Sequence, residues 1–340
     1  MEKLTEKEKK EWKKLYSVAE EIQKIEPWKY LNDMDILTLT IPEVRDIIYC
    51  SVMGKAGMHK GIAIYFGDQL TNFLDHLDDI PTHMILNYNE CLICQYIPKR
   101  ETMPENMKLM EELGVSYQKE WISFECMEKG YAPRKMDTKD VGLMTTILEN
   151  FYQIFTLVAT GDLKADFENG ETILRRYEEE KDCFQTLVMP QMIFEPIYIQ
   201  MMEMGEDLKN AIKKLETTPM VIEYDFLNYL PMPIGKEGDK IIYPRIQIMA
   251  EHNSQMLLDM HLVEAKKYDN EIQYAEECAN SFIDFLLQVG KPKMVLVRDE
   301  ASLKILEPIT KAVGIKLKIS PKLEAIDFAE QDFMKQMRER

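Results

Sequence analysis

The chain has 340 residues, of which 42 are Lys or Arg and 59 are Asp or Glu, so its formal net charge at pH 7 is −17. An apolar fraction of 46% suffices to bury cores and excludes a largely disordered chain. The acidic balance argues against non-specific binding to nucleic acids or anionic membranes, because both need clustered Lys and Arg side chains.

The first part of the chain is predicted to alternate between helices and strands. A helix from Lys7 to about Leu31 is indicated by apolar spacings of three and four, with a stop signal at Pro27. The next predicted elements are strands over Ile47–Met53 and Gly61–Phe66, a helix bearing Leu70, Phe73, Leu74 and Leu77, a strand over His83–Ile97, a helix over Glu105–Leu113, a strand over Tyr117–Cys126, a helix over Thr138–Val158 capped by Asp137 or Thr138, strands over Glu171–Arg176 and Cys183–Met189, and a helix over Tyr198–Leu215. This mixture predicts an α+β or α/β domain over residues 1–215.

A second domain is predicted over residues 216–340, after the boundary signal Glu216-Thr217-Thr218-Pro219. Its predicted elements are strands over Met220–Leu230, Lys240–Met249 and Gln255–Glu264, a helix over Asp269–Val289 that ends at Gly290, a strand over Met294–Val297, a helix over Ser302–Val313, a strand over Ile315–Ile319 and a helix over Lys322–Met337. The order β-β-β-α-β-α-β-α predicts a mixed sheet covered by helices. This is the topology of ribonuclease-H-like domains.

Localisation is predicted from what the sequence lacks. The charged first ten residues offer no apolar core for a signal peptide, and no run approaches the roughly 18 apolar residues that span a bilayer. The six cysteines are diluted in a long chain and are expected to be reduced thiols. We therefore expect a cytoplasmic protein without a membrane partner.

Three acidic residues of the second domain form a candidate metal site. In ribonuclease-H-like nucleases, carboxylates of the first strand, the fourth strand and a late helix converge on Mg²⁺ or Mn²⁺, which prefer oxygen ligands. The matching positions are Asp225, Asp299 and Asp327, with Glu324 and Glu264 as further options. A nuclease or phosphoesterase with these catalytic residues is one hypothesis.

The alternative for the same acids is structural. Asp299 precedes a predicted helix, where an acid complements the helix dipole, and Asp327 lies on a helix face rich in acids. With 59 acidic residues in the chain, three at suitable positions are easily found. The structural interpretation is therefore favoured, and no resident metal or other cofactor is expected.

Other motifs give weaker signals. Cys91 and Cys94 have the spacing of half a zinc site, but no second pair exists, and in a strand the two would point to opposite faces, as buried thiols. Gly54-Lys55-Ala56-Gly57 lacks the P-loop pattern and is predicted to be a hairpin turn. Tyr131 and Arg134, in a loop with Gly130 and Pro133, form a candidate ligand-binding wall. The alternative, a loop pinned to the surface by Tyr131, is favoured.

Several motifs together resemble an uncharacterised bacterial family that pairs two domains of unknown function. The resemblance rests on Pro27-Trp28, Cys50-Ser51-Val52-Met53-Gly54, Gly61-Ile62-Ala63-Ile64-Tyr65-Phe66-Gly67, Glu128-Lys129-Gly130-Tyr131-Ala132-Pro133-Arg134 and Gly290-Lys291-Pro292-Lys293-Met294-Val295-Leu296-Val297-Arg298-Asp299. It covers most of the chain and implies a bacterial, cytoplasmic protein, without assigning catalytic residues.

These observations predict a two-domain binding or interaction protein with a degenerate ribonuclease-H-like second domain. The metal-dependent nuclease or phosphoesterase remains the alternative, and a small-molecule site near Tyr131 and Arg134 is a third hypothesis. Residues 216–340 carry 16 basic and 21 acidic side chains, a net charge of −5, against −12 for residues 1–215. Charge therefore disfavours nucleic acid as a partner, less strongly for the second domain, and leaves a protein or small-molecule partner open.

Overall fold

The computed structural model describes residues 3–55, 57, 59–74, 89–191, 204–226, 233–263 and 271–338. The chain divides into two compact units, which we call unit 1 (Met1–Pro196) and unit 2 (Ile197–Arg340). The boundary predicted between residues 215 and 216 falls after the helix Glu206–Lys213, whereas this division falls before it. Parts of the predictions lie outside the described residues: Leu77, residues 83–88, 198–203 and 227–230, Glu264 and Asp269.

Unit 1 is built on an eight-stranded sheet with the order β6-β5-β4-β3-β2-β1-β7-β8. The strands are β1 (Leu37–Thr40), β2 (Ile48–Met53), β3 (Gly61–Phe66), β4 (Cys91–Pro98), β5 (Glu120–Met127), β6 (Arg134–Lys135), β7 (Glu171–Glu178) and β8 (Cys183–Pro190). All neighbours are antiparallel except β1 and β7. The predicted hairpin of β2 and β3 is confirmed, and Gly54, with φ 116°, begins its turn.

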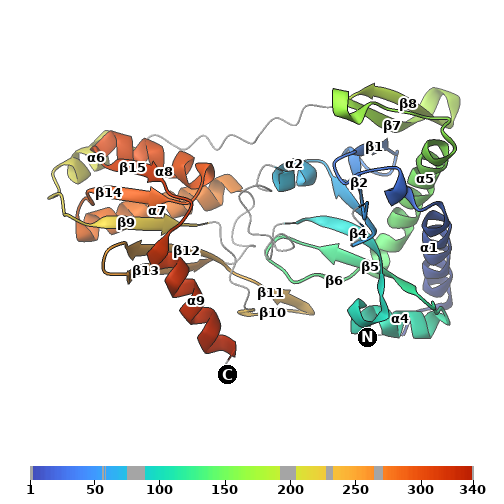
Figure 1. Cartoon of the computed structure of the whole chain (residues 1–340), viewed down its shortest axis with the longest axis horizontal. Coiled ribbons are helices and arrows are strands. Elements are labelled where there is room, and N and C mark those ends of the chain that lie inside the picture. The colour runs from blue at the N-terminus through green and yellow to red at the C-terminus, as the bar shows by residue number, and fades with distance from the viewer. Residues whose placement is uncertain are drawn as a thin grey trace. The chain divides into compact units, whose positions relative to one another are not determined.

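Among the described residues, the helices of unit 1 are α1 (Glu6–Ile25), α2 (Gln69–Leu74), α4 (Pro104–Leu113) and α5 (Val141–Thr160). One turn of 3₁₀-helix (Pro27–Lys29) follows α1, after Glu26 ends that helix in the left-handed region. Figure 1 shows α1 and α5 side by side against the sheet, where Trp12, Tyr16 and Phe151 are buried in the core. The opposite face of the sheet has a smaller cluster around Tyr65 and Ile93.

The segment Thr138–Thr160 is the one described helix that is long and apolar enough to cross a membrane. No such segment was expected from the sequence. Half of its most apolar window is buried, and α5 contributes Met144, Phe151 and Phe155 to the core of unit 1. We therefore assign α5 as a core helix, because packing against α1 and the sheet explains its composition.

Unit 2 contains a five-stranded sheet with the order β13-β12-β9-β14-β15. The strands are β9 (Val221–Asp225), β12 (Arg245–Glu251), β13 (Met256–Val263), β14 (Met294–Val297) and β15 (Lys316–Ile319), and a separate hairpin of β10 (Gly235–Glu237) and β11 (Lys240–Ile242) lies between β9 and β12 in the chain. β12 is antiparallel to both of its neighbours, whereas β9, β14 and β15 are parallel. The predicted order of strands and helices is observed apart from the inserted hairpin.

Helices cover both faces of the unit 2 sheet. The described helices of unit 2 are α6 (Glu206–Lys213), which contacts α8, and α7 (Glu271–Val289), α8 (Glu300–Val313) and α9 (Glu324–Arg338). On one face, Tyr224 of β9 packs edge-on against Phe282 of α7. On the other face, Ile248 of β12 shares a core with Ile326 of α9. The chain therefore has helices and mixed sheets in both units, and the predicted α+β class is confirmed.

Candidate functional site

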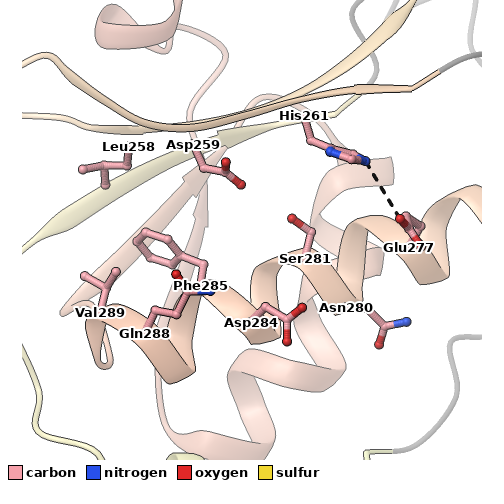
Figure 2. Close-up of a pocket in the computed structure, with 10 residues that line it drawn as sticks. All are labelled: Leu258, Asp259, His261, Glu277, Asn280, Ser281, Asp284, Phe285, Gln288 and Val289. Atoms are coloured by element: carbon pink, nitrogen blue, oxygen red, sulfur yellow. Dashed lines mark ion pairs between the residues drawn. The ribbon is translucent and has the colours of Figure 1, made fainter.

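A groove of about 430 Å³ lies in unit 2 between the edge strand β13 and helix α7 (Figure 2). Its volume is within the range typical of small-ligand sites. The lining residues are Leu258, Asp259 and His261 from β13 and Glu277, Asn280, Ser281, Asp284, Phe285, Gln288 and Val289 from α7. We call this site the β13–α7 groove.

The local sequence explains why these side chains meet. Asp259 and His261 are two residues apart on β13, so both project from the same face of the sheet. Glu277, Ser281 and Asp284 recur at spacings of three and four on α7, which places them along one side of the helix. The adjacent side of α7 packs on the sheet. The groove therefore forms where polar sides of a strand and a helix face each other.

The charge of the β13–α7 groove is mainly negative. Asp259, Glu277 and Asp284 contribute three carboxylates, and His261 is the one basic side chain of the lining. Figure 2 shows His261 directed toward Glu277, with 3.9 Å between Nε2 and the carboxylate Oε1. Both side chains are about two-fifths exposed, at 43% and 38%, so solvent weakens this ion pair. The carboxylates are thus accessible to a cation from outside.

The groove also has an apolar part. Leu258, Phe285 and Val289 line it together with the polar side chains, and Phe285 is only 7% exposed. Carboxylates beside apolar carbon atoms suit a ligand with a positive head and a hydrocarbon chain. The arrangement can therefore hold an alkylammonium group by charge and by apolar contact together.

Two of the predicted metal ligands meet at an arginine. Asp225 ends the central strand β9 and is 2% exposed, and its Oδ2 lies 2.6 Å from Nε of Arg298. The same guanidinium binds Oδ1 of Asp327 on α9 through Nη2, at 2.8 Å. Burial opposes the charged form of Arg298, but both carboxylates outweigh it and raise its pKa. The position between the two acids is thus filled by a fixed positive charge.

The third predicted ligand, Asp299, begins helix α8. Its carboxylate accepts a hydrogen bond from the backbone N–H of Ser302 at 2.7 Å, which is the geometry of a helix N-cap. Glu324, the other option within the described residues, pairs with Lys322 at 3.3 Å. Across the described parts of the chain, no group of three or more His, Cys, Asp or Glu side chains is arranged to hold a metal ion.

Glu223 is a buried carboxylate that the sequence-based candidates do not include. It lies on β9, two residues before Asp225 and on the same face, and it is fully buried. Its Oε2 accepts the backbone N–H groups of Ala325 and Ile326 at 2.9 and 3.0 Å, and Oε1 contacts Nδ1 of His252. Glu223 therefore holds the first turn of α9 against the central strand. Its place in an apolar strand is the sequence signal that could have identified it.

The predicted wall of Tyr131 and Arg134 is part of a tightly packed loop in unit 1. Nη2 of Arg134 lies 2.5 Å from Oε1 of Glu128, and Nη1 lies 2.9 Å from Oδ1 of Asp137. Tyr131 is 6% exposed, and its N–H donates to the carbonyl oxygen of Glu128 at 3.0 Å. Asp137 thus binds an arginine and does not cap α5, which begins after a 3₁₀ turn. These contacts give the loop a structural role.

The two cysteines of the CxxC motif lie on opposite faces of β4, as the strand period predicts. Cys91 belongs to the smaller cluster of unit 1 and Cys94 to its main core. Both are buried, free thiols. Burial raises the pKa of Cys94 to about 12 and that of Cys91 further, so neither is a thiolate at neutral pH. The prediction of buried thiols is confirmed.

Comparison with known proteins identifies two domains. Residues 12–175 match a domain of unknown function, DUF7309, and residues 208–334 match a second domain of unknown function, DUF6930. No curated protein and no solved structure matches the chain. The predicted pairing of two domains of unknown function is confirmed, and the second match begins with α6.

Proposed function

For this chain, in which one domain matches DUF7309 and the other matches DUF6930, we propose a binding function without catalysis. The ligand is an organic cation with an ammonium group on a hydrocarbon chain, and it binds in the β13–α7 groove. This chemistry occurs in the lysine side chains of a partner protein and in free polyamines. The observation that carries the proposal is the set of three carboxylates beside an apolar surface.

The groove supports this ligand class by both of its components. Asp259, Glu277 and Asp284 all line the groove, so their carboxylates attract an ammonium group there. Phe285 and Leu258 offer apolar contact to the methylene groups between the charges. An anion would find no comparable partner in the groove, because its one basic side chain, His261, already faces Glu277. Nucleic acid is therefore disfavoured at this site.

Arg298 supports a non-catalytic unit 2. We propose that unit 2 is a degenerate ribonuclease-H-like domain, on the basis of its sheet order, in which the first strand is central and the fourth and fifth follow it in parallel. In the alternative function, Asp225, Asp299 and Asp327 would bind Mg²⁺ or Mn²⁺. Arg298 engages two of these carboxylates and Ser302 the third, so each has a structural partner. A nuclease assay with Mn²⁺ tests the alternative, which predicts cleavage that disappears in Asp225→Asn.

Isothermal titration of the full-length protein tests the binding proposal. One arm uses spermidine and another a lysine-rich peptide, so that free polyamines are distinguished from protein segments. Glu277→Gln and Asp284→Asn should each weaken binding about two- to fivefold, as expected for solvent-exposed charge pairs. Glu307→Gln on α8 is the matched control, because it removes one exposed carboxylate outside the groove.

Two results would contradict the proposal. Heat signals that respond equally to Glu277→Gln and to Glu307→Gln would mean that only the net charge attracts the cation. No binding of either probe at low salt would exclude the ligand class. Binding should also weaken as salt is added, because the carboxylates are open to solvent.

We further propose that the protein acts in the bacterial cytoplasm. All six cysteines are free, which suits a reducing compartment. The bacterial assignment rests on the family resemblance of the sequence motifs. Cell fractionation followed by immunodetection tests the location, and recovery with the membrane fraction would contradict it.

A further inference from the structure

Strand β13 is the outer strand of the unit 2 sheet among the described strands, and it pairs only with β12. Its outer edge presents backbone N–H and C=O groups that a further strand could bind. Lysine and proline, which protect many such edges, are absent from Met256–Val263, and the irregularity in its register with β12 lies between Leu257 and Asp259, so the stretch from Asp259 to Val263 is regularly paired. In this stretch, Met260 and Leu262 are 43% and 45% exposed. The outer edge of β13 therefore has the properties of a strand edge that pairs with another strand.

The register of β12 and β13 assigns the faces of this edge. Met260 and Leu262 lie opposite Ile248 and Ile246, which belong to the core under α9, so these residues share the α9 face. Asp259 and His261 alternate with them and therefore lie on the α7 face, in the β13–α7 groove. The edge is apolar on one face and carries one acid and one histidine on the other.

The three residues Asp259-Met260-His261, which lie in the regularly paired part of β13, are self-complementary. In an antiparallel pair of two such strands centred on Met260, each residue lies opposite the one at the mirrored position. Asp259 of one copy then faces His261 of the other, twice by symmetry, and Met260 faces Met260. Acid–histidine pairs form on one face while apolar side chains meet on the other. No foreign strand is needed to obtain this match.

We infer that the edge strand β13 pairs antiparallel with β13 of a second copy of this chain, centred on Met260, and so forms a two-fold dimer with a continuous ten-stranded sheet. The self-pairing is isologous, so it closes at two copies and does not propagate. The inference goes beyond the proposed cation binding, because it concerns the free edge of β13. It would also bring the two β13–α7 grooves to one face of the shared sheet.

Sedimentation velocity of the full-length protein over a concentration series tests the dimer. The wild-type protein should sediment as two copies, and Met260→Lys should weaken self-association about tenfold or more, because two like charges would lie opposite each other. Leu287→Lys is the matched control, since Leu287 is an equally exposed apolar residue, at 42%, on α7. A wild-type protein that stays monomeric at every concentration overturns the inference.

Exchanging the charges tests the register itself. Asp259→His places histidine opposite histidine and His261→Asp places acid opposite acid, so each variant alone should associate weakly. An equimolar mixture of the two variants should dimerise again, because each histidine then faces an aspartate. The double variant Asp259→His with His261→Asp should also recover. Failure of both recoveries overturns the proposed register, as would an association that survives Met260→Lys.

The proposed dimer and the proposed cation site can be refuted independently of each other. Met260 lies on the α9 face and outside the groove, so Met260→Lys should bind spermidine as the wild-type protein does while losing self-association. Loss of cation binding in the wild-type protein, with sedimentation as two copies retained, would overturn the proposed function alone.

Discussion

The two units stabilise buried carboxylates in different ways. In unit 1, Glu125 of β5 is 4% exposed, and it accepts hydrogen bonds from neutral side chains: the Ser123 hydroxyl donates to it at 2.7 Å and the Gln95 amide at 3.0 Å. In unit 2, Glu223 receives two backbone N–H groups of α9, and Asp225 receives the guanidinium of Arg298. The acids of unit 2 therefore join separate elements, whereas Glu125 chiefly joins neighbouring strands.

In each unit, an arginine also lies between two carboxylates, and the sequence separation that its contacts span differs between the units. Arg134 binds Glu128 and Asp137, which are close in sequence and form one loop. Arg298, after β14, binds Asp225 on β9 and Asp327 on α9, so its contacts close the fold over long sequence separations. The same kind of arginine–carboxylate contact thus holds one loop together in unit 1, whereas in unit 2 it connects elements that are distant in sequence.

The largest expected effect is on Arg298. Arg298→Met removes the positive charge beside Asp225, which is 2% exposed, and should lower the free energy of unfolding of unit 2 by about 2–4 kcal/mol. Arg134→Met is the matched control and should cost unit 1 about 1 kcal/mol, because its acids are 27% and 43% exposed. Urea unfolding followed by hydrogen exchange resolves the two units. Equal losses in the free energy of unfolding for the two variants would contradict the distinction between a local contact at Arg134 and a long-range contact at Arg298.

Glu223→Gln tests the attachment of α9. The amide oxygen still accepts hydrogen bonds from the backbone, but the charge-assisted character of these bonds and of the His252 contact is lost. Unit 2 should lose about 1–3 kcal/mol. In this variant, the amide protons of Ala325 and Ile326 should exchange faster than in the wild-type protein, whereas those of α8 should change less. Unchanged protection of these two amides would contradict the assigned role.

Glu251 at the end of β12 predicts acid sensitivity in unit 2. Hydrogen bonds from the backbone and side chain of Ser254, and from Asn253, lower its pKa from 4.5 to about 2. The unfolded chain then binds more protons between these values, so this stabilisation is complete above about pH 4.5 and is lost as the pH falls toward 2. Because the turn residues are exposed, the contribution is about 1 kcal/mol. Glu251→Gln should flatten the acid limb of the unfolding curve, and an unchanged limb would refute the assignment.

Sequence patterns predicted most elements because apolar periodicity survives in both units, as in α1 and α7. They missed β1, a four-residue strand whose Leu37 and Leu39 are buried, because its pairing with β7 is supplied by distant residues. They identified Asp225, Asp299 and Asp327 as a group, but not that Arg298 and Ser302 would engage them. The β13–α7 groove was not predicted either, since it depends on how a strand and a helix meet. Local sequence patterns therefore do not predict polar contacts between residues that are distant in sequence.

Glu125 gives the smallest effect, with the opposite sign to Glu251. Burial raises its pKa above 4.5 and outweighs the hydrogen bonds from Ser123 and Gln95. The folded state therefore retains the proton longer than the unfolded chain, so stability falls as the pH rises from about 4.5 through the raised pKa. Glu125→Gln removes this penalty and should make unit 1 slightly more stable at pH 7, because the Gln95 amide can turn its oxygen toward the new NH₂ group. Thermal unfolding at pH 5 and pH 8 checks the sign: the gain from Glu125→Gln should be larger at pH 8. A destabilised variant at pH 8 would mean that the charge of Glu125 is as well compensated as the charges of unit 2.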